Sequence, residues 1–232
     1  MKKNQLKKER PLITDINPKS PISESYRTLR TNIEFSSIDE TIQVIMCTSS
    51  GPSEGKSTTG TNIAVVSAQS EKKTLIIDAD LRKPTMHHTF GLSNRQGLTN
   101  ILSSQGTWKE LIKETRIKNL YLLPAGPIPP NPSEILASKR MTALLDELRK
   151  EFDMIIIDTP PALAVTDAQI VASKVDGVIL VVDSGNVKRE AAMKMKSNIE
   201  HVGAKILGVV INNVERTSDE YYYYYYYGHD DK

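Results

Sequence analysis

The chain has 232 residues, a formal net charge of +2 and 39% hydrophobic residues, which suits one good-sized domain with a short tail. A nearly balanced charge argues against a dedicated nucleic-acid binder, since such proteins are usually strongly basic. The single cysteine, Cys47, excludes an internal disulfide framework and fits a reducing compartment. No apolar run reaches about 18 residues, and the start of the chain lacks the apolar core of a secretory signal. We therefore expect a cytoplasmic protein without a membrane span.

The chain begins with a polar, basic segment that is interrupted by prolines at positions 11, 18 and 21. We expect residues 1–20 to form a flexible arm, and a solvated arm is favoured over a specific docking element. Apolar side chains at helical spacing then predict a helix over residues 22–35, capped by Ser20 or Ser23.

Apolar runs typical of strands then alternate with helical patterns. The predicted strands are residues 42–47, 74–77, 120–123, 154–157, 178–182 and 206–211. The predicted helices are residues 56–69, 98–115 (two short helices broken at Gly106), 133–152, 167–174 and 188–201. Continuous apolar strands are expected where helices cover both faces of a parallel sheet. The sequence thus predicts an α/β fold, a doubly wound and mostly parallel sheet, as one domain over residues 21–214, followed by a disordered tail over 215–232.

The first predicted strand runs into a glycine-containing loop and then a helix. This loop matches the phosphate-binding pattern G-x-x-x-x-G-K-[ST], except that Ser50 replaces the first glycine. In such loops main-chain amides hold the phosphates, the lysine reaches the β- and γ-phosphates and the following hydroxyl binds Mg²⁺. We expect the nucleotide to be held by the residues of this P-loop, Gly51, Pro52, Ser53, Glu54, Gly55, Lys56, Ser57 and Thr58.

Acidic residues end two further strands, where ligands of open α/β sheets bind. Asp78 and Asp80 follow the second strand and Asp158 ends the fourth. Carboxylates in these places are typical of Mg²⁺ sites in P-loop proteins, so we expect ATP and Mg²⁺, with Ser57, Asp80 and Asp158 toward the metal and Asp158 acting through water. Arg82 and Lys83 either clamp phosphate or balance this charge, and the position of Asn212 after the last strand suggests an adenine contact.

The chain from about residue 20 onward resembles the bacterial tyrosine kinases of capsule and exopolysaccharide synthesis. The resemblance rests on the P-loop GPSEGKST, the strands LIIDADLRKP and IIIDTPP, and the pattern Glu24-x-x-Arg27-x-x-Arg30. Its last mark is a cluster of adjacent tyrosines near the end of the chain, Tyr221, Tyr222, Tyr223, Tyr224, Tyr225, Tyr226 and Tyr227.

The resemblance implies an ATP-dependent protein-tyrosine kinase in which Lys56, Asp78 and Asp80 are catalytic. It implies that a carboxylate of the Asp78 and Asp80 motif accepts the tyrosine proton; Asp78 is the candidate, with Asp80 as the alternative. It implies a homo-oligomeric ring assembled through Glu24, Arg27 and Arg30, with the tail tyrosines phosphorylated between subunits. It also implies a transmembrane adaptor on a separate chain, which places the kinase at the inner face of the cell membrane. Further implied partners are enzymes of sugar-nucleotide and polysaccharide synthesis and a tyrosine phosphatase, with no nucleic acid.

Two other function classes remain open. A partition or septum-positioning ATPase shares the strand and aspartate arrangement, but its signature lysine would stand where this chain has Gly51. A non-catalytic, nucleotide-dependent scaffold would have its tyrosines modified by another enzyme. Two of the marks also have alternative interpretations. The tyrosine run can be a low-complexity tract without a role, and Glu24, Arg27 and Arg30 can form a solvent-exposed helix face whose charged side chains pair with one another.

Overall fold

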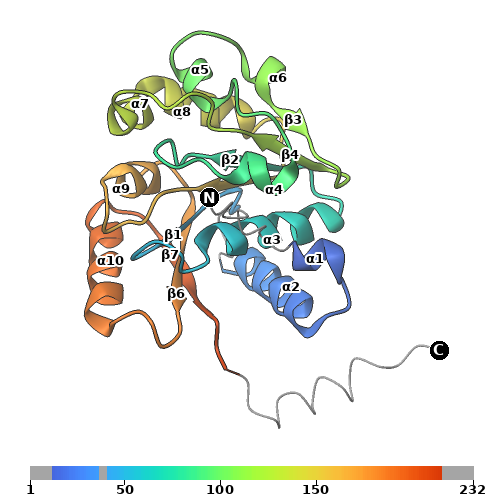
Figure 1. The fold of residues 1–232 in the computed structure, drawn as a ribbon, viewed down its shortest axis with the longest axis vertical. Helices are drawn as coiled ribbons and strands as arrows, with labels where there is room; N and C mark the ends of the chain where they lie inside the picture. The colour runs from blue at the N-terminus through green and yellow to red at the C-terminus, as the bar shows by residue number, and fades with distance from the viewer. Residues whose placement is uncertain (1–11, 37–40, 216–232) are drawn as a thin grey trace, which may run out of the picture.

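A seven-stranded sheet forms the centre of the computed structural model, which describes residues 12–36 and 41–215 (Figure 1). The strands stand in the order β3-β4-β2-β5-β1-β6-β7, and every neighbouring pair is parallel except β3 with β4. Their bounds are β1 Val44–Ser49, β2 Thr74–Asp78, β3 Lys113–Glu114, β4 Leu120–Leu123, β5 Met154–Asp158, β6 Gly177–Asp183 and β7 Ile206–Asn212.

Helices cover both faces of this sheet because alternate strand residues point into two separate apolar clusters. Ile45 and Ile156 pack on the face of α1 (Ile13–Ile16), α2 (Pro21–Glu34), α3 (Lys56–Gln69) and α4 (Met86–Phe90). Met46 and Ile157 pack on the other face. That face is covered by α5 (Leu98–Leu102), α6 (Trp108–Leu111), α7 (Pro132–Ala137), α8 (Lys139–Leu148), α9 (Asp167–Ala172) and α10 (Arg189–His201). Figure 1 shows α1, α2 and α3 together on one side of the sheet and α7 and α8 on the opposite side.

The doubly wound α/β sheet predicted from the sequence is confirmed, and each predicted strand is present. Two predicted helices differ in detail. The helix predicted over residues 133–152 is divided at Ser138, whose backbone is extended and whose hydroxyl accepts a hydrogen bond from Met141 N to begin α8. The second half of the segment predicted over 98–115 ends earlier, since Lys113 and Glu114 pair antiparallel with β4. The short helices α1 and α4 were not predicted.

The packed part of the chain begins nearer the amino terminus than expected. Residues 12–20 belong to the predicted flexible arm, yet Leu12 is buried and α1 lies against α2 and α3. Thr14 N and Oγ1 donate to Asn62 Oδ1 of α3 at 3.1 and 2.8 Å. Hydrogen bonds and apolar burial thus hold this segment to the helix that follows the P-loop. The remainder of the arm, residues 1–11, lies outside the described residues.

α2 begins as the sequence predicts, because Ser20 Oγ accepts a hydrogen bond from Ser23 N at 3.1 Å.

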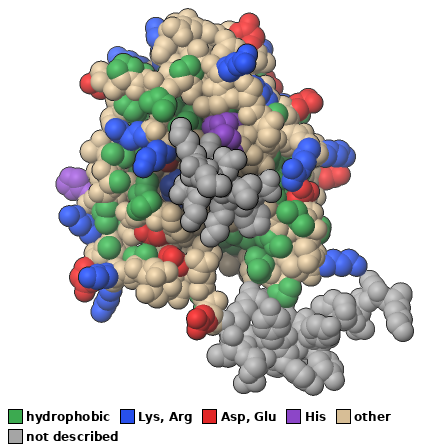
Figure 2. Space-filling view, viewed as in Figure 1, with side chains coloured by type: hydrophobic (Ala, Val, Ile, Leu, Met, Phe, Trp, Pro, Cys, Tyr) green, Lys and Arg blue, Asp and Glu red, His purple; other side chains and the backbone are tan. Residues whose placement is uncertain are grey.

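The tail from residue 216 onward, with its tyrosine cluster, lies outside the part of the chain that the structure describes. None of the helices described is both long and apolar enough to cross a membrane. Acidic and basic side chains are interspersed over the face shown in Figure 2, in keeping with the small net charge.

Candidate active site

The P-loop joins the carboxyl end of β1 to the amino end of α3, as predicted. Gly55 adopts a left-handed conformation with φ +95°, and a Cβ at this position would lie 2.1 Å from Asn212 Nδ2. Asn212 Nδ2 in turn donates to the main-chain oxygen of Glu54 at 3.1 Å. Only glycine suits both the backbone conformation and this close approach, so β7 closes one side of the loop. The expected contact of Asn212 with adenine stays a prediction.

The buried carboxylate of Glu54 fixes the beginning of the loop. Its Oε1 accepts hydrogen bonds from Gly51 N and, at 2.5 Å, from the hydroxyl of Ser50. These contacts give Ser50, which departs from the usual glycine of the motif, a structural role that the sequence pattern did not indicate. Two sets of contacts therefore hold the P-loop. Glu54 bonds to other residues of the loop, and Asn212 of β7 bonds to the main chain of Glu54.

Lys56 lies between two of the predicted metal-site carboxylates. Its Nζ is 3.3 Å from Asp158 Oδ1 and 3.7 Å from Asp80 Oδ2. Ser57 Oγ donates to Asp158 Oδ2 at 2.7 Å and accepts from Lys56 Nζ at 3.0 Å. The structure thus gathers Lys56, Ser57, Asp80 and Asp158 from three segments of the chain into one cluster.

Asp78 stands beside this cluster but deeper in the protein. It is paired in register with Asp158 across β2 and β5, and it is fully buried. Asp78 Oδ2 accepts hydrogen bonds from Thr85 N and Met86 N at 3.0 Å each, so it binds the amino end of α4. Burial, with the charge of Asp158, raises the pKa of Asp78 to about 7. Burial also raises the pKa of Asp80, and the ammonium of Lys56 opposes that rise.

The charges of the cluster fit a magnesium nucleotide. Among the described residues, Asp80 and Asp158 both form their ion pair with Lys56, and Asp78 forms none, so three buried carboxylates stand against one ammonium group. No preformed centre of three or more His, Cys, Asp or Glu ligands occurs in the described part of the chain. Magnesium does not need such a centre, because it is usually held by one or two carboxylates, waters and the phosphates of a nucleotide. The Ser57 hydroxyl and the Asp80 and Asp158 carboxylates suit that role.

Other predicted residues lie away from this cluster. Glu24, Arg27 and Arg30 lie on α2, where Arg27 Nη1 pairs with Glu24 Oε2 at 2.6 Å. Arg30 Nη1 donates to the main-chain oxygen of Val66 in α3 at 3.1 Å. Their predicted contacts between subunits are not tested by these contacts within one chain. The tyrosine cluster, residues 221–227, lies outside the described residues.

Sequence reasoning missed the partner of Arg82, which is Asp167 at the start of α9. The only signal was an acidic residue beginning a predicted helix, which indicates a helix start and no particular partner. The guanidinium of Arg82 is therefore hydrogen-bonded to a carboxylate of the same chain.

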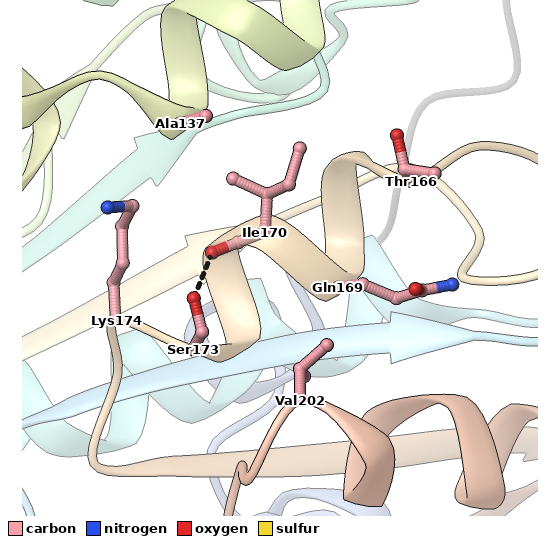
Figure 3. A pocket seen from close by; sticks show the side chains of 7 residues that line it. All are labelled: Ala137, Thr166, Gln169, Ile170, Ser173, Lys174 and Val202. Atoms are coloured by element: carbon pink, nitrogen blue, oxygen red, sulfur yellow. Dashed lines mark hydrogen bonds between the residues drawn. The ribbon is translucent and has the colours of Figure 1, made fainter.

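A groove of about 300 Å³ lies elsewhere, between α7, α9 and the end of α10 (Figure 3). Its lining includes Thr166, Gln169, Ile170 and Lys174, and none of the P-loop or carboxylate residues. It is therefore separate from the nucleotide cluster.

Comparisons with known proteins identify the relatives of this chain. A family model described as an AAA domain matches residues 42–211. The chain is 48% identical over 204 residues to the tyrosine-protein kinase YwqD of Bacillus subtilis (strain 168), covering 88% of this chain and 86% of that protein. The crystal structure of the chimerical protein CapA2B2 matches with a TM-score of 0.85 and 45% identity, covering 88% of this chain and 90% of that one.

A more distant match shows the fold alone. The septum site-determining protein MinD of Pyrococcus horikoshii OT3, complexed with Mg-ADP, has a TM-score of 0.65 at 23% identity and covers 76% of this chain and 72% of that one. The P-loop NTPase fold is therefore shared more widely than the close sequence similarity.

The 48% identity to the tyrosine-protein kinase YwqD, together with the AAA domain match, identifies the family of this chain. The chain belongs to the bacterial tyrosine-protein kinases.

Proposed function

We propose that this kinase uses ATP and Mg²⁺ to phosphorylate the tyrosines of its own tail between subunits and so regulates capsule or exopolysaccharide synthesis. The observation that carries the proposal is the position of Lys56 between Asp80 and Asp158, with the Ser57 hydroxyl beside them. This arrangement offers a cation for phosphate and oxygen ligands for magnesium at the end of a phosphate-binding loop.

Each residue of the cluster has a proposed role. Main-chain amides of residues 53–58 hold the phosphates, because Gly51 N donates to Glu54 and Pro52 has no N–H, and Lys56 stabilises charge on the transferred phosphoryl group. Ser57 and Asp80 hold the metal, with Asp158 acting through water. Bound Mg²⁺ would neutralise the negative charge of the phosphates and of these buried carboxylates.

The phenol proton goes to a carboxylate of the Asp78 and Asp80 pair, and Asp78 is our candidate for the base, as the family resemblance implies. Its oxygens accept hydrogen bonds from main-chain amides on either side of the turn after β2. These bonds hold the carboxylate in place but also cover it, so the substrate must displace part of this turn to reach it. Asp80 lies nearer the surface, which makes the pair suitable for a direct mutational comparison.

The tail tyrosines are proposed as acceptors on a neighbouring subunit in a ring. Glu24, Arg27 and Arg30 would exchange their present partners within the chain for a neighbour's surface. A flexible peptide of about 15 residues spans roughly 20 Å on average, which is sufficient for transfer between adjacent subunits. Each phosphate adds about −1.5 to −2 charges, so accumulating phosphates would repel one another and dissociate the ring.

A membrane adaptor is proposed as the activator, since P-loop enzymes commonly require a second component to complete the site. It would hold the kinase at the inner face of the membrane, and the basic residues 1–10 would add attraction to anionic lipid. Released phosphorylated subunits would act on enzymes of sugar-nucleotide and polysaccharide synthesis, and a tyrosine phosphatase would reset the cycle. Full kinase activity in dilute protein without an adaptor would contradict this dependence.

Mixing two complementary variants, one without catalytic activity and one without acceptor tyrosines, tests transfer between subunits. One chain carries Lys56→Met, and the other has all tail tyrosines of residues 221–227 replaced by Phe. We expect phosphate on the tail of the Lys56→Met chain when both are incubated with Mg-ATP at high protein concentration. The Lys56→Met chain alone is the control, and its tail should remain unmodified. No phosphate in the mixture, under conditions where wild-type protein is phosphorylated, would show that transfer occurs within one chain.

A further inference from the structure

Arg82 and Asp167 form a closely held ion pair next to the carboxylates of the active site. Arg82 Nε donates to Asp167 Oδ2 at 2.9 Å, and Arg82 Nη2 donates to Asp167 Oδ1 at 2.9 Å. The Asp167 side chain is fully buried, whereas that of Arg82 is 38% exposed. Ser133 of α7 completes the group, donating to Asp167 Oδ1 at 2.6 Å and accepting from Arg82 Nη2 at 3.0 Å. This two-bond geometry fixes the guanidinium more firmly than a single contact would.

The pair connects the two segments that carry the site's carboxylates. Arg82 follows Asp80 by two residues, in the turn after β2. Asp167 begins α9, which follows β5 and its terminal Asp158. β2 and β5 are adjacent in the sheet and Asp78 is in register with Asp158. A bond from Arg82 to Asp167 therefore fastens the two turns to each other just beyond the strands.

Contacts inside the turn after β2 pass this restraint to Asp80. Lys83 N donates to Asp80 Oδ1 at 3.0 Å, and Asp80 N donates to Asp78 Oδ1 at 3.3 Å. The main chain of Lys83, the residue after Arg82, is thus bonded to the Asp80 carboxylate, and the main chain of Asp80 is bonded to Asp78. Moving Arg82 would move the main chain that orients Asp80 opposite Lys56.

We propose that Arg82 and Asp167 are positioning residues that set the separation of Asp80 and Asp158, and thereby the affinity of the site for magnesium. The proposal rests on the magnesium nucleotide site proposed above. Neither residue belongs to the P-loop or to the carboxylate cluster: Asp167 acts on Arg82, and Arg82 acts through the turn that holds Asp80. Residues that orient metal ligands in this indirect way typically contribute about 10- to 100-fold to metal affinity.

The chain supplies a matched control in Arg149 and Asp176. Arg149 Nη1 and Nη2 donate to the two carboxylate oxygens of Asp176 at 2.8 and 2.6 Å. Asp176 also accepts from Val44 N, at the amino end of β1, at 2.7 Å. This pair has the same two-bond geometry but lies at the opposite end of the strands from the P-loop. Breaking it costs stability without touching the turns that carry Asp80 and Asp158.

The test compares Asp167→Asn and Arg82→Lys with Asp176→Asn and Arg149→Lys. Titration calorimetry measures ADP binding with and without Mg²⁺, and thermal unfolding measures stability. For both variants of the active-site pair we expect the Mg²⁺ concentration needed for half-maximal ADP binding to rise about tenfold, with little change in ADP binding without metal. The control variants should lose comparable stability and keep the wild-type Mg²⁺ requirement.

Equal Mg²⁺ requirements in the two sets of variants would overturn the proposal and leave Arg82 and Asp167 a purely structural pair. If Asp167→Asn does not fold, Ser133→Ala removes only the third member of the group and should still raise the Mg²⁺ requirement; an unchanged value there would also count against the proposal. If ADP binding by the wild-type protein did not depend on Mg²⁺, that result would instead refute the proposed nucleotide site itself. The two failures are therefore distinguishable without any measurement of kinase activity.

Discussion

Asn212 and Glu54 are 158 residues apart in the sequence, yet the side chain of Asn212 holds the main chain of Glu54 through a 3.1 Å hydrogen bond. Asn212 is the last residue of β7, and Glu54 lies in the P-loop immediately before Gly55. The end of the sheet's edge strand thereby supports the phosphate-binding backbone. This contact assigns Asn212 a role in loop support, next to the adenine contact that its position suggested.

Replacing Asn212 with Ala distinguishes these two roles. Loss of loop support should weaken ADP and GDP binding by the same factor, about five- to tenfold, since one hydrogen bond contributes about 1 kcal/mol. Loss of an adenine contact should instead weaken ADP binding alone. Fluorescence titration with both nucleotides measures the ratio of their dissociation constants. A changed ratio would contradict loop support as the main role of Asn212.

Gly55→Ala tests the close approach of β7 to the P-loop. The added Cβ would lie 2.1 Å from Asn212 Nδ2 in a backbone with φ +95°, so we expect nucleotide affinity to fall more than tenfold. Gly203→Ala is the control, because Gly203 has a similar positive φ of +74° and an added methyl group there would meet no described atom within 4 Å. Both variants should lose about 1–2 kcal/mol of unfolding free energy from the left-handed backbone. Retained nucleotide binding in Gly55→Ala would show that the loop and β7 separate easily.

Asp78→Asn and Asp80→Asn test the assignment of the base. We expect Asp78→Asn to bind Mg-ADP with near-normal affinity and to lose at least about 100-fold in the rate of tyrosine phosphorylation, the usual effect of removing a general base. Asp80→Asn should weaken Mg²⁺-dependent nucleotide binding as well, because Asp80 faces Lys56 and the metal position. Single-turnover kinetics and calorimetry supply both readouts. Near-normal phosphoryl transfer in Asp78→Asn would make the base assignment wrong.

The ion pair of Asp176 predicts a pH-dependent stability. Burial would raise the pKa of Asp176, but hydrogen bonds from Arg149 and from the amides of Val44 and Gln43 outweigh it and lower the pKa. A lowered pKa contributes stability above the unfolded value of about 4 and loses it as the pH falls through the folded-state value. We expect Asp176→Asn to cost about 1–3 kcal/mol at pH 7 and less at pH 3, measured by urea unfolding. An equal cost at both pH values would show that the effect is not electrostatic.

The sheet was predictable because parallel strands buried on both faces appear in sequence as continuous apolar runs. Leu120–Leu123 was predicted to the residue, and Met154–Asp158 to within one residue. The helix of Lys56–Gln69 was also predicted, since the glycine-containing loop before it marks its start. The short helices α1 and α4 and the two-residue strand β3 were missed, because segments this short show too little periodicity for their type to be recognised.

The core of the candidate site was also predictable, because Lys56, Asp80 and Asp158 each follow a recognisable strand end. Their convergence follows from parallel strands presenting their carboxyl ends at one edge of the sheet. The partners that hold them were not predictable. Asp167 is 85 residues from Arg82, and the Glu54 carboxylate turns back on its own loop. Such contacts depend on how helices and turns pack against one another, and no local sequence pattern indicates them.

Transfer of phosphate from ATP to the tail tyrosines by the Lys56 cluster can be measured on the purified chain of residues 1–232. The chain is incubated with Mg-ATP at high concentration, where mass action favours assembly of subunits in place of recruitment by the proposed adaptor. Intact mass and peptide mapping then count and locate the phosphates. We expect several phosphates on residues 221–227 of the wild-type chain and none in Lys56→Met or Asp158→Asn protein of verified fold. Equal phosphate in wild-type and Lys56→Met chains, or phosphate confined to sites outside the tail, would contradict this mechanism.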